Sequence, residues 1–391
     1  MLLILVLRPM AIRTGLLDVP NERSSHQRPT PLIGGVAIYL AVGAAYSIPA
    51  AIGLVPINRV FASFFVAGLI LVSVGLMDDY IRLSTLGKFA AQIIASLLMI
   101  YGGGVVLTDL GAMTFSGTTV ELGWFSVPFT VFATLGVINA LNMSDGLDGL
   151  SGTLSLISLT GLMIAAIFGG AFSEAFILVL LAASIFGFLL FNFRVPGRKR
   201  AAVFMGDAGS MFIGFSLTWF AIALAQGPDR VMTPAAALWF LMLPIFDTVA
   251  MMFRRIIRRR SPFAPDKEHV HHIFLMAGFD VNETVAIMAA AALIGVGIGL
   301  LSMGLLVPEI SVAGLFVVAG LFYMWMILRA WKVMRFIERS ICRRTIVPDR
   351  RSTTERRIGS DANYNGVDRR SGDDRRIHQR RRIRRESTLE R

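Results

Sequence analysis

The chain has 391 residues, of which 55% are hydrophobic and 16% are charged, and its formal net charge is +12. Soluble domains of average composition carry about 25% charged residues, so these values exclude an ordinary soluble protein and favour a membrane protein. The single cysteine, Cys342, excludes a disulfide scaffold and cysteine-ligated zinc or iron–sulfur sites. Residues 333–391 hold 18 of the 38 lysines and arginines, so the charge is local and does not make nucleic acid the expected partner.

The first 33 residues are predicted to contain a partial helix and a loop. Met1–Leu7 is apolar but too short to span a bilayer before Arg8 interrupts it. We expect it to be the end of a helix whose natural start lies upstream, or a helix that enters the membrane only in part. The following loop, Asp18–Pro31, is polar and proline-rich; such loops often carry function, although a plain connector is an equal alternative.

Apolar runs long enough to cross a bilayer follow one another through residues 34–332. A membrane-spanning helix needs about 20 mainly apolar residues. The expected spans are residues 34–54, 59–77, 88–106, 124–143, 151–170, 174–193, 207–226, 234–253, 283–306 and 311–332. The sequence therefore predicts an all-α polytopic membrane protein with about ten full transmembrane helices.

Residues 333–391 differ from this bundle. They repeat pairs of arginines, first after Asp349 and again after Asp368, and they hold few apolar residues that could form a core. A disordered basic tail is the expected state. Attraction of the arginine pairs to anionic lipid head groups is the alternative reason for the pattern.

Basic residues mark one side of the predicted bundle. Sixteen lysines and arginines fall in alternate loops, at residues 8–33, 78–88, 143–150, 194–206 and 254–282. The opposite loops hold only Arg59 and Arg230. Because positively charged loops stay in the cytoplasm, this set of alternate loops and the tail are predicted to be cytoplasmic.

Acidic residues collect at the cytoplasmic ends of the predicted helices. Ionised groups within a membrane span cost free energy, so each is expected to have a partner or a function there. Asp78 and Asp79 directly follow an apolar run, and adjacent carboxylates that repel each other are usually relieved by a divalent cation. The alternative is that both are ordinary interfacial acids.

A second polar group lies in the sequence NALNMSDGLDGL, residues 139–150. If the helix continues, Asn139, Asn142, Asp145 and Asp148 lie one turn apart and form a polar stripe on one face. The glycines among them allow a sharp exit and a close approach of the backbone to a ligand. The alternative is a polar stripe that only packs helices together.

The next candidates are Asp207 and a basic loop. Asp207, in MGDAGS at 205–210, is expected to be an N-cap whose helix start could hold a phosphate or a carboxylate-bound metal, or simply to begin a helix. Loop 254–272 contains Arg254 and Arg255 and ends in three histidines, His269, His271 and His272. No HExxH pattern accompanies them, so anion contacts fit better than zinc, and the arginines could also be topology anchors.

Carboxylates, histidines and arginines on one face indicate an anionic substrate and a divalent metal. Carboxylates alone would repel a phosphate, so a metal must lie between them; Mg²⁺ is the expected ion, with Mn²⁺ as the alternative. The sequence has no GxxxxGK[ST] motif and no GxSxG motif, which excludes a P-loop site and argues against a serine hydrolase.

These motifs together resemble the polyprenyl-phosphate N-acetylhexosamine-1-phosphate transferases. The resemblance rests on the Asp78–Asp79 pair, NALNMSDGLDGL, MGDAGS and His269-Val-His271-His272, with a similar first loop through Gly35, and it covers residues 8–332. The HxHH form resembles the undecaprenyl-phosphate N-acetylglucosamine-1-phosphate transferases more than the muramoyl-pentapeptide transferases. One departure is Arg82, which stands where the family often has a third acid of a DDxxD motif.

The resemblance implies that a sugar 1-phosphate moves from a UDP-N-acetylhexosamine to undecaprenyl phosphate, releasing UMP and starting a lipid-linked envelope glycan such as O-antigen. It implies that Asp78 or Asp79 activates the lipid phosphate and that Asp207, with Asp148, holds Mg²⁺. The nucleotide and metal region would be shaped by Asp145, Asp148, Asn139 and Asn142, and the diphosphate or sugar would be held by His269, His271, His272 and Arg255.

The resemblance also implies a multi-pass protein of the bacterial inner membrane, in contact with membrane lipid, with a cytoplasmic active site and a homodimer as an option. Two other classes stay open. An ion-coupled transporter would place its acids near the bilayer midplane, and here they gather at one face. A non-catalytic binder of lipid head groups would lose no turnover on replacement of Asp207.

Overall fold

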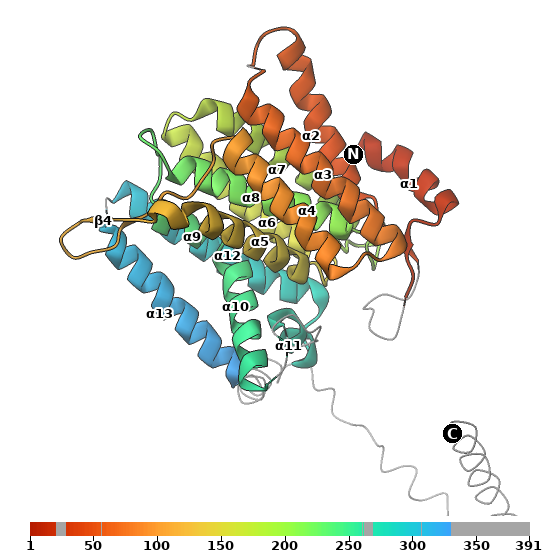
Figure 1. The fold of residues 1–391 in the computed structure, drawn as a ribbon. Helices are drawn as coiled ribbons and strands as arrows, with labels where there is room; N and C mark the ends of the chain where they lie inside the picture. Colours follow the sequence, from red (N-terminus) through yellow and green to blue (C-terminus); the bar gives the residue numbers. More distant parts are fainter. Residues whose placement is uncertain (21–28, 56, 260, 262–268, 306, 330–391) are drawn as a thin grey trace, which may run out of the picture. The chain divides into compact units, whose positions relative to one another are not determined.

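The structure is a computed structural model that describes residues 1–20, 29–55, 57–259, 261, 269–305 and 307–329. Within these ranges it is almost entirely helical (Figure 1). Nine of the described helices are long and apolar enough to cross a membrane, and one bent pair of helices makes a tenth span. The prediction of an all-α polytopic protein with about ten spans is confirmed. The predicted tail, residues 333–391, lies outside the described residues.

Helices make up most of the described chain. In chain order they are α1 (Leu2–Thr14), α2 (Gly34–Ala51), α3 (Arg59–Ile81), α4 (Thr85–Leu97), α5 (Ser126–Ser144), α6 (Leu150–Phe168), α7 (Phe172–Asn192), α8 (Gly206–Ala225), α9 (Pro234–Phe240), α10 (Met242–Ile257), α11 (Val270–Met276), α12 (Val281–Gly304) and α13 (Glu309–Leu328). A π-helical turn, Leu98–Gly102, extends α4, and a 3₁₀ turn, Gly123–Phe125, precedes α5. Two short antiparallel pairs join β1 (Leu17–Asp18) to β2 (Thr30–Pro31) and β3 (Asp109–Ala112) to β4 (Thr119–Glu121).

Helix α8 is the centre of the bundle. It packs against α2, α3, α5 and α6, and nearly all of its residues are buried. Glycines permit the closest of these contacts: a Cβ on Gly35 would overlap the Gly209 backbone, and one on Gly75 would overlap the Ala208 backbone. The start of α8 is thereby brought against the end of α3, because small residues let helix backbones approach each other.

The predicted span 234–253 is wrong as a single straight helix. It is broken at Leu241 into α9 and α10, which meet at an angle of 81°. Pro244 has no N–H to bond to the Phe240 carbonyl four residues earlier, so the helix restarts with the proline in its first turn. The Phe240 carbonyl instead accepts a hydrogen bond from Ser158 Oγ on α6 at 2.7 Å, which satisfies it inside the bundle.

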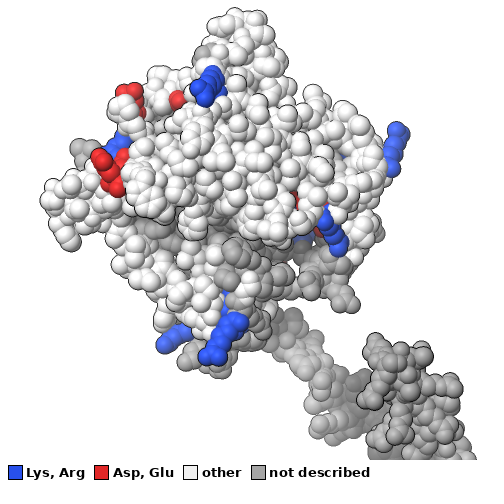
Figure 2. All heavy atoms as spheres, in the orientation of Figure 1, with Lys and Arg blue, Asp and Glu red and all other residues white. Residues whose placement is uncertain are grey.

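Charged side chains lie toward the margins of the molecule. Figure 2 shows a broad face almost without lysine, arginine, aspartate or glutamate, as a surface in contact with lipid requires. At one end Arg230 bonds to Asp109 at 3.5 Å and to Glu309 at 3.3 Å, and Glu309 also accepts from Ala112 N–H at 2.7 Å. These contacts tie the β3–β4 hairpin to α13 at the end opposite Asp78 and Asp207.

Candidate functional site

The acidic pair lies where α3 ends. Arg82 stops the helix in a left-handed conformation, with φ of 55°, and its N–H bonds back to the Asp78 carbonyl. The Asp78 side chain then accepts a hydrogen bond from Leu83 N–H at 2.7 Å. The sharp turn after the pair therefore fixes Asp78 at the end of the helix, close to the start of α4.

Asp79 holds the start of α8. Its Oδ1 accepts from Asp207 N–H at 3.0 Å and its Oδ2 from Ala208 N–H at 3.5 Å, so it bonds amides that have no partner within their own helix. Gly206 has a φ of 72°, and a Cβ there would overlap the Asp79 carboxylate, so a larger residue does not fit. Asp207 was predicted to be the N-cap, which is wrong: it lies in the first turn, and Asp79 acts as the cap from another helix.

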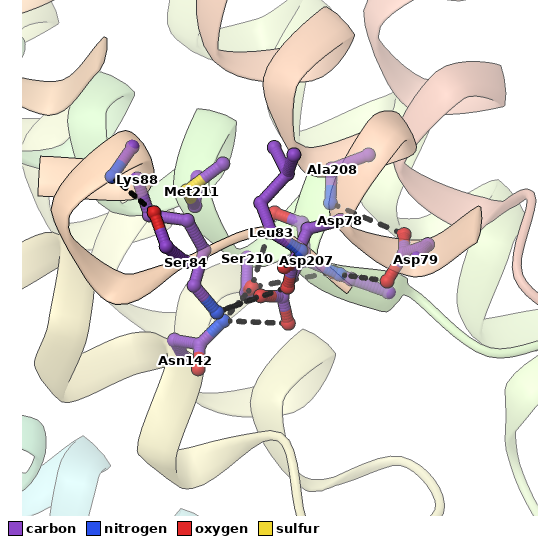
Figure 3. Close-up of polar contacts among 12 residues, drawn as sticks. Asp78, Asp79, Leu83, Ser84, Lys88, Asn142, Asp207, Ala208, Ser210 and Met211 are labelled. Atoms are coloured by element: carbon purple, nitrogen blue, oxygen red, sulfur yellow. Dashed lines mark hydrogen bonds and ion pairs between the residues drawn. The ribbon is translucent and has the colours of Figure 1, made fainter. Parts of the chain in front are cut away.

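Lys88 joins two of the acids. Ser84 caps α4 by accepting from Gly87 N–H at 3.2 Å, and Lys88 follows one turn later. Its Nζ lies 2.9 Å from Asp78 Oδ2 and 3.0 Å from Asp207 Oδ2 (Figure 3). A single ammonium group therefore lies between two carboxylates that would otherwise repel each other.

The two predicted asparagines take different places. Asn142 Nδ2 donates to Asp207 Oδ1 and to Ser210 Oγ, each at 2.9 Å, so it belongs to the acidic cluster, which we define as Asp78, Asp79, Lys88, Asn142 and Asp207 (Figure 3). Asn139 lies one turn deeper. Its Nδ2 donates to Gln92 Oε1 at 2.9 Å and to the Leu135 carbonyl at 2.7 Å. Asn139 thus links α5 to α4 behind the cluster.

The predicted polar stripe from Asn139 to Asp148 is not formed on one helix. Helix α5 ends at Ser144 and Asp145 is its C-cap. Asp148 is buried and accepts from Arg194 Nε at 2.7 Å and from Ala201 N–H at 3.1 Å, so it anchors the loop after α7. Its predicted role as a metal ligand stays a prediction, and in the structure the side chain bonds to these two partners.

Asp145 interacts electrostatically with two acids of the acidic cluster and with Asp148. Burial, followed by the charges of Asp207, Asp79 and Asp148, raises the pKa of Asp145 to about 8. The carboxyl is therefore mostly protonated at pH 7 and can donate a hydrogen bond, as long as no cation lies beside it.

The three histidines, His269, His271 and His272, form the histidine segment at the start of α11. His269 Nδ1 lies 2.8 Å from Asp247 Oδ2. His271 is 1% exposed, and neither of its ring nitrogens has a hydrogen-bond partner in the described structure. A Cβ on Gly146 would lie 2.7 Å from His271 Nε2, so this ring packs directly on the turn beside Asp145. Arg254 and Arg255 are both buried near the end of α10.

His271 gives the protein a sensitivity to acid. Burial lowers the pKa of His271 to about 3, and the charge of His272 is the second cause of this shift. A histidine in the unfolded chain titrates near 6.5. The buried, neutral His271 ring therefore makes its full contribution to the stability of the folded protein above about pH 6.5. This contribution is lost as the pH falls toward 3, because in that interval only the unfolded state binds the proton. At pH 5 the expected loss is about 2 kcal/mol.

Thermal unfolding of purified protein in detergent, measured between pH 7.5 and pH 5, checks this expectation. His271→Gln keeps a polar side chain of similar reach but does not titrate, so its melting temperature is expected to fall less than that of the unmodified protein over the same interval. Identical acid dependence of the two proteins would assign the effect to other groups.

The acidic cluster offers oxygen ligands suited to Mg²⁺. No group of three or more histidine, cysteine or acidic side chains that could hold a metal ion is found in the described part of the chain. Mg²⁺ in proteins is commonly bound through one or two carboxylates together with substrate phosphates. Asp78 and Asp207 already share one cation, the Lys88 ammonium, and hence provide the two-carboxylate arrangement that such binding needs.

Several side chains of this region were not among the predicted site residues. They are Lys88, Gln92, Arg194, Ser210 and Tyr323. In the sequence Lys88 looked like one more basic residue of a cytoplasmic loop. The one available signal was its position a single turn after a capping serine, in the segment that follows the acidic pair.

Comparisons with known proteins show which family the chain resembles. Residues 61–225, which contain the whole acidic cluster, match glycosyl transferase family 4. Three curated relatives are named undecaprenyl-phosphate alpha-N-acetylglucosaminyl 1-phosphate transferase. The relative from Escherichia coli O157:H7 is 36% identical over 334 residues, which cover 85% of this chain and 89% of that protein. The relative from Yersinia pestis is 37% identical over 340 residues (87% and 91%), and that from Haemophilus influenzae is 34% identical over 300 residues (77% and 83%).

Proposed function

This chain belongs to the polyprenyl-phosphate N-acetylhexosamine-1-phosphate transferases of glycosyl transferase family 4, and we propose that its substrates are UDP-N-acetylglucosamine and undecaprenyl phosphate. It is a membrane-embedded glycosyl 1-phosphate transferase. The proposed products are undecaprenyl-diphosphate N-acetylglucosamine and UMP, and the lipid product would start an envelope glycan such as O-antigen.

One observation carries the proposal: three carboxylates, an ammonium and an amide from four different helices meet at one end of the bundle. Two anionic substrates can approach each other only where their charge is screened. A site at the ends of membrane helices also suits a lipid whose phosphate stays at the interface while its chain stays in the bilayer. An ion-coupled transporter is less well supported, because these groups lie at helix ends.

The reaction forms a bond between a lipid phosphate oxygen and the β-phosphorus of the UDP-sugar, and it breaks the bond from that phosphorus to the oxygen that leaves with UMP. We assign the activation of the lipid phosphate to Asp78 or Asp79, the adjacent carboxylates at the end of α3. Lys88 would neutralise charge on the attacking or the transferred phosphate. The histidine segment and Arg255 remain our candidates for holding the diphosphate or sugar.

Asp78 and Asp207 would hold Mg²⁺, with Asn142 oriented toward Asp207 and Asp145 and Asp148 nearby. When bound, the metal would screen the phosphate charge that accumulates during transfer. The alternation of basic loops supports a cytoplasmic active site in a bacterial inner membrane. A homodimer stays a prediction from the resemblance.

The test is an assay of the purified full-length protein in detergent with undecaprenyl phosphate, Mg²⁺ and a panel of UDP-sugars labelled in the sugar or in the uridine. With UDP-N-acetylglucosamine, sugar label is expected in the lipid and an equal amount of uridine label in UMP. No lipid label with any N-acetylhexosamine would refute the substrate assignment. Undiminished turnover in excess EDTA would refute the metal requirement.

A further inference from the structure

A buried carboxylate on α10 joins three elements outside the acidic cluster. Asp247 is 3% exposed. Its Oδ2 lies 2.8 Å from His269 Nδ1, and its Oδ1 accepts from Val270 N–H at 3.2 Å and from the Tyr323 hydroxyl at 2.9 Å. One side chain of α10 thus bonds to the histidine segment, to the first residue of α11 and to α13, and Figure 1 draws α10 between α11 and α13.

These contacts determine which nitrogen of His269 carries a proton. An ionised carboxylate can only accept hydrogen bonds, so Nδ1 is the protonated nitrogen and Nε2 is the acceptor in the neutral ring. The backbone N–H of Val270 and the hydroxyl of Tyr323 also donate to this carboxylate. The His269 ring is therefore held in one tautomer, and it cannot turn without losing its bond to Asp247.

The same carboxylate places the rest of the histidine segment. Val270 begins α11, so its bond to Asp247 fixes the start of the helix that carries His271 and His272. The rings of His269 and His271 lie parallel, with centroids 5.8 Å apart, and those of His271 and His272 are 4.2 Å apart. A displacement of His269 is therefore passed to His271, the ring that packs on Gly146.

We propose that Asp247 and Tyr323 are positioning residues that hold His269 in its Nδ1–H tautomer and fix the histidine segment against the turn beside Asp145. The part of this inference that concerns catalysis rests on the proposed function, because it takes the histidine segment to hold the UDP-sugar. It gives α13 a part in the reaction through Tyr323, whose hydroxyl bonds to Asp247 and not to a histidine.

Asp247→Asn tests the tautomer without changing the shape of the side chain. The carboxamide oxygen can take the Oδ1 position and still accept from Val270 N–H and from the Tyr323 hydroxyl. The NH₂ group then faces His269 Nδ1, so this nitrogen must become an acceptor. In ¹⁵N-histidine NMR of the full-length protein, with His269 assigned from His269→Gln, the ring is expected to change from Nδ1–H to Nε2–H. We expect kcat/KM for UDP-N-acetylglucosamine to fall about 100-fold, with the apparent KM for undecaprenyl phosphate unchanged.

Tyr323→Phe and Tyr39→Phe form a matched pair. The Tyr39 hydroxyl donates to the Phe65 carbonyl over the same distance, 2.9 Å, but between α2 and α3. Tyr323→Phe is expected to lower kcat/KM for the UDP-sugar about fivefold and to keep the Nδ1–H tautomer, because Asp247 remains. Tyr39→Phe is expected to leave both readouts unchanged. This pair decides the question if Asp247→Asn does not fold.

Three results would overturn the inference: an Nε2–H ring at His269 in the unmodified protein, full kcat/KM in Asp247→Asn, or equal losses in Tyr323→Phe and Tyr39→Phe. Failure of the proposed function looks different. If the unmodified protein transfers no sugar phosphate, the proposed function is refuted, and the NMR tautomers alone decide whether Asp247 positions His269.

Discussion

Replacing Asp207 by asparagine is expected to lower kcat about 10³-fold while the protein stays folded. The asparagine has the same shape but removes the carboxylate that Lys88, Asn142 and the proposed metal share. Its melting temperature is expected to stay level or to rise slightly, because one of three neighbouring negative charges is gone. Steady-state kinetics and thermal unfolding of the same purified sample measure both effects.

Asp229→Asn is the control for this variant. Asp229 is an exposed acid in the connection between α8 and α9, at the end opposite the acidic cluster. Its replacement changes the net charge by the same amount and is expected to leave kcat unchanged. A kcat for Asp207→Asn within tenfold of the unmodified protein would remove Asp207 from the centre of the mechanism.

Replacing Lys88 by methionine is expected to lower kcat about 10²-fold and, at the same time, to lower the Mg²⁺ concentration needed for half-maximal activity. Methionine keeps most of the length of the side chain but leaves Asp78 and Asp207 without their shared ammonium. The two carboxylates then attract a divalent cation more strongly, while the transferred phosphate loses a positive charge. Titration of activity with Mg²⁺ separates these two effects.

Arg82→Met is the matched control for Lys88→Met. Arg82 is an exposed basic residue at the end of α3, six residues before Lys88. Its replacement is expected to change neither kcat nor the Mg²⁺ dependence. If Lys88→Met needs more Mg²⁺ than the unmodified protein, the ammonium and the metal do not compete for the same carboxylates.

The spans were predictable from the sequence because membrane insertion depends on local hydrophobicity. Nine of the ten predicted runs correspond to helices that the structure describes as long enough to span. The break between α9 and α10 was missed, although Pro244 lies inside the predicted run. A proline alone does not decide between a kink and a break, and here Ser158 from another helix satisfies the carbonyl that the break leaves unpaired.

The members of the acidic cluster were predictable and their contacts were not. Four members were recognised because polar residues at the ends of membrane helices usually have a partner or a function. They are Asp78, Asp79, Asn142 and Asp207. Asp148 was grouped with them on helical spacing, but the chain leaves the helix after Ser144 and Arg194 becomes its partner. The capping of α8 by Asp79 and the bridge made by Lys88 depend on contacts over more than 100 residues, which no local pattern encodes.

The surroundings of α8 and α13 differ, and this affects how the two parts of the site respond to the host bilayer. In the membrane span of α8, 94% of the residues are buried, compared with 17% in the span of α13. Thinner or thicker acyl-chain layers tilt helices that face lipid, at a cost of fractions of a kcal/mol per ångström of mismatch. The position of Asp207 is therefore expected to be independent of acyl-chain length. Tyr323, by contrast, lies on a helix whose tilt is expected to change with that length.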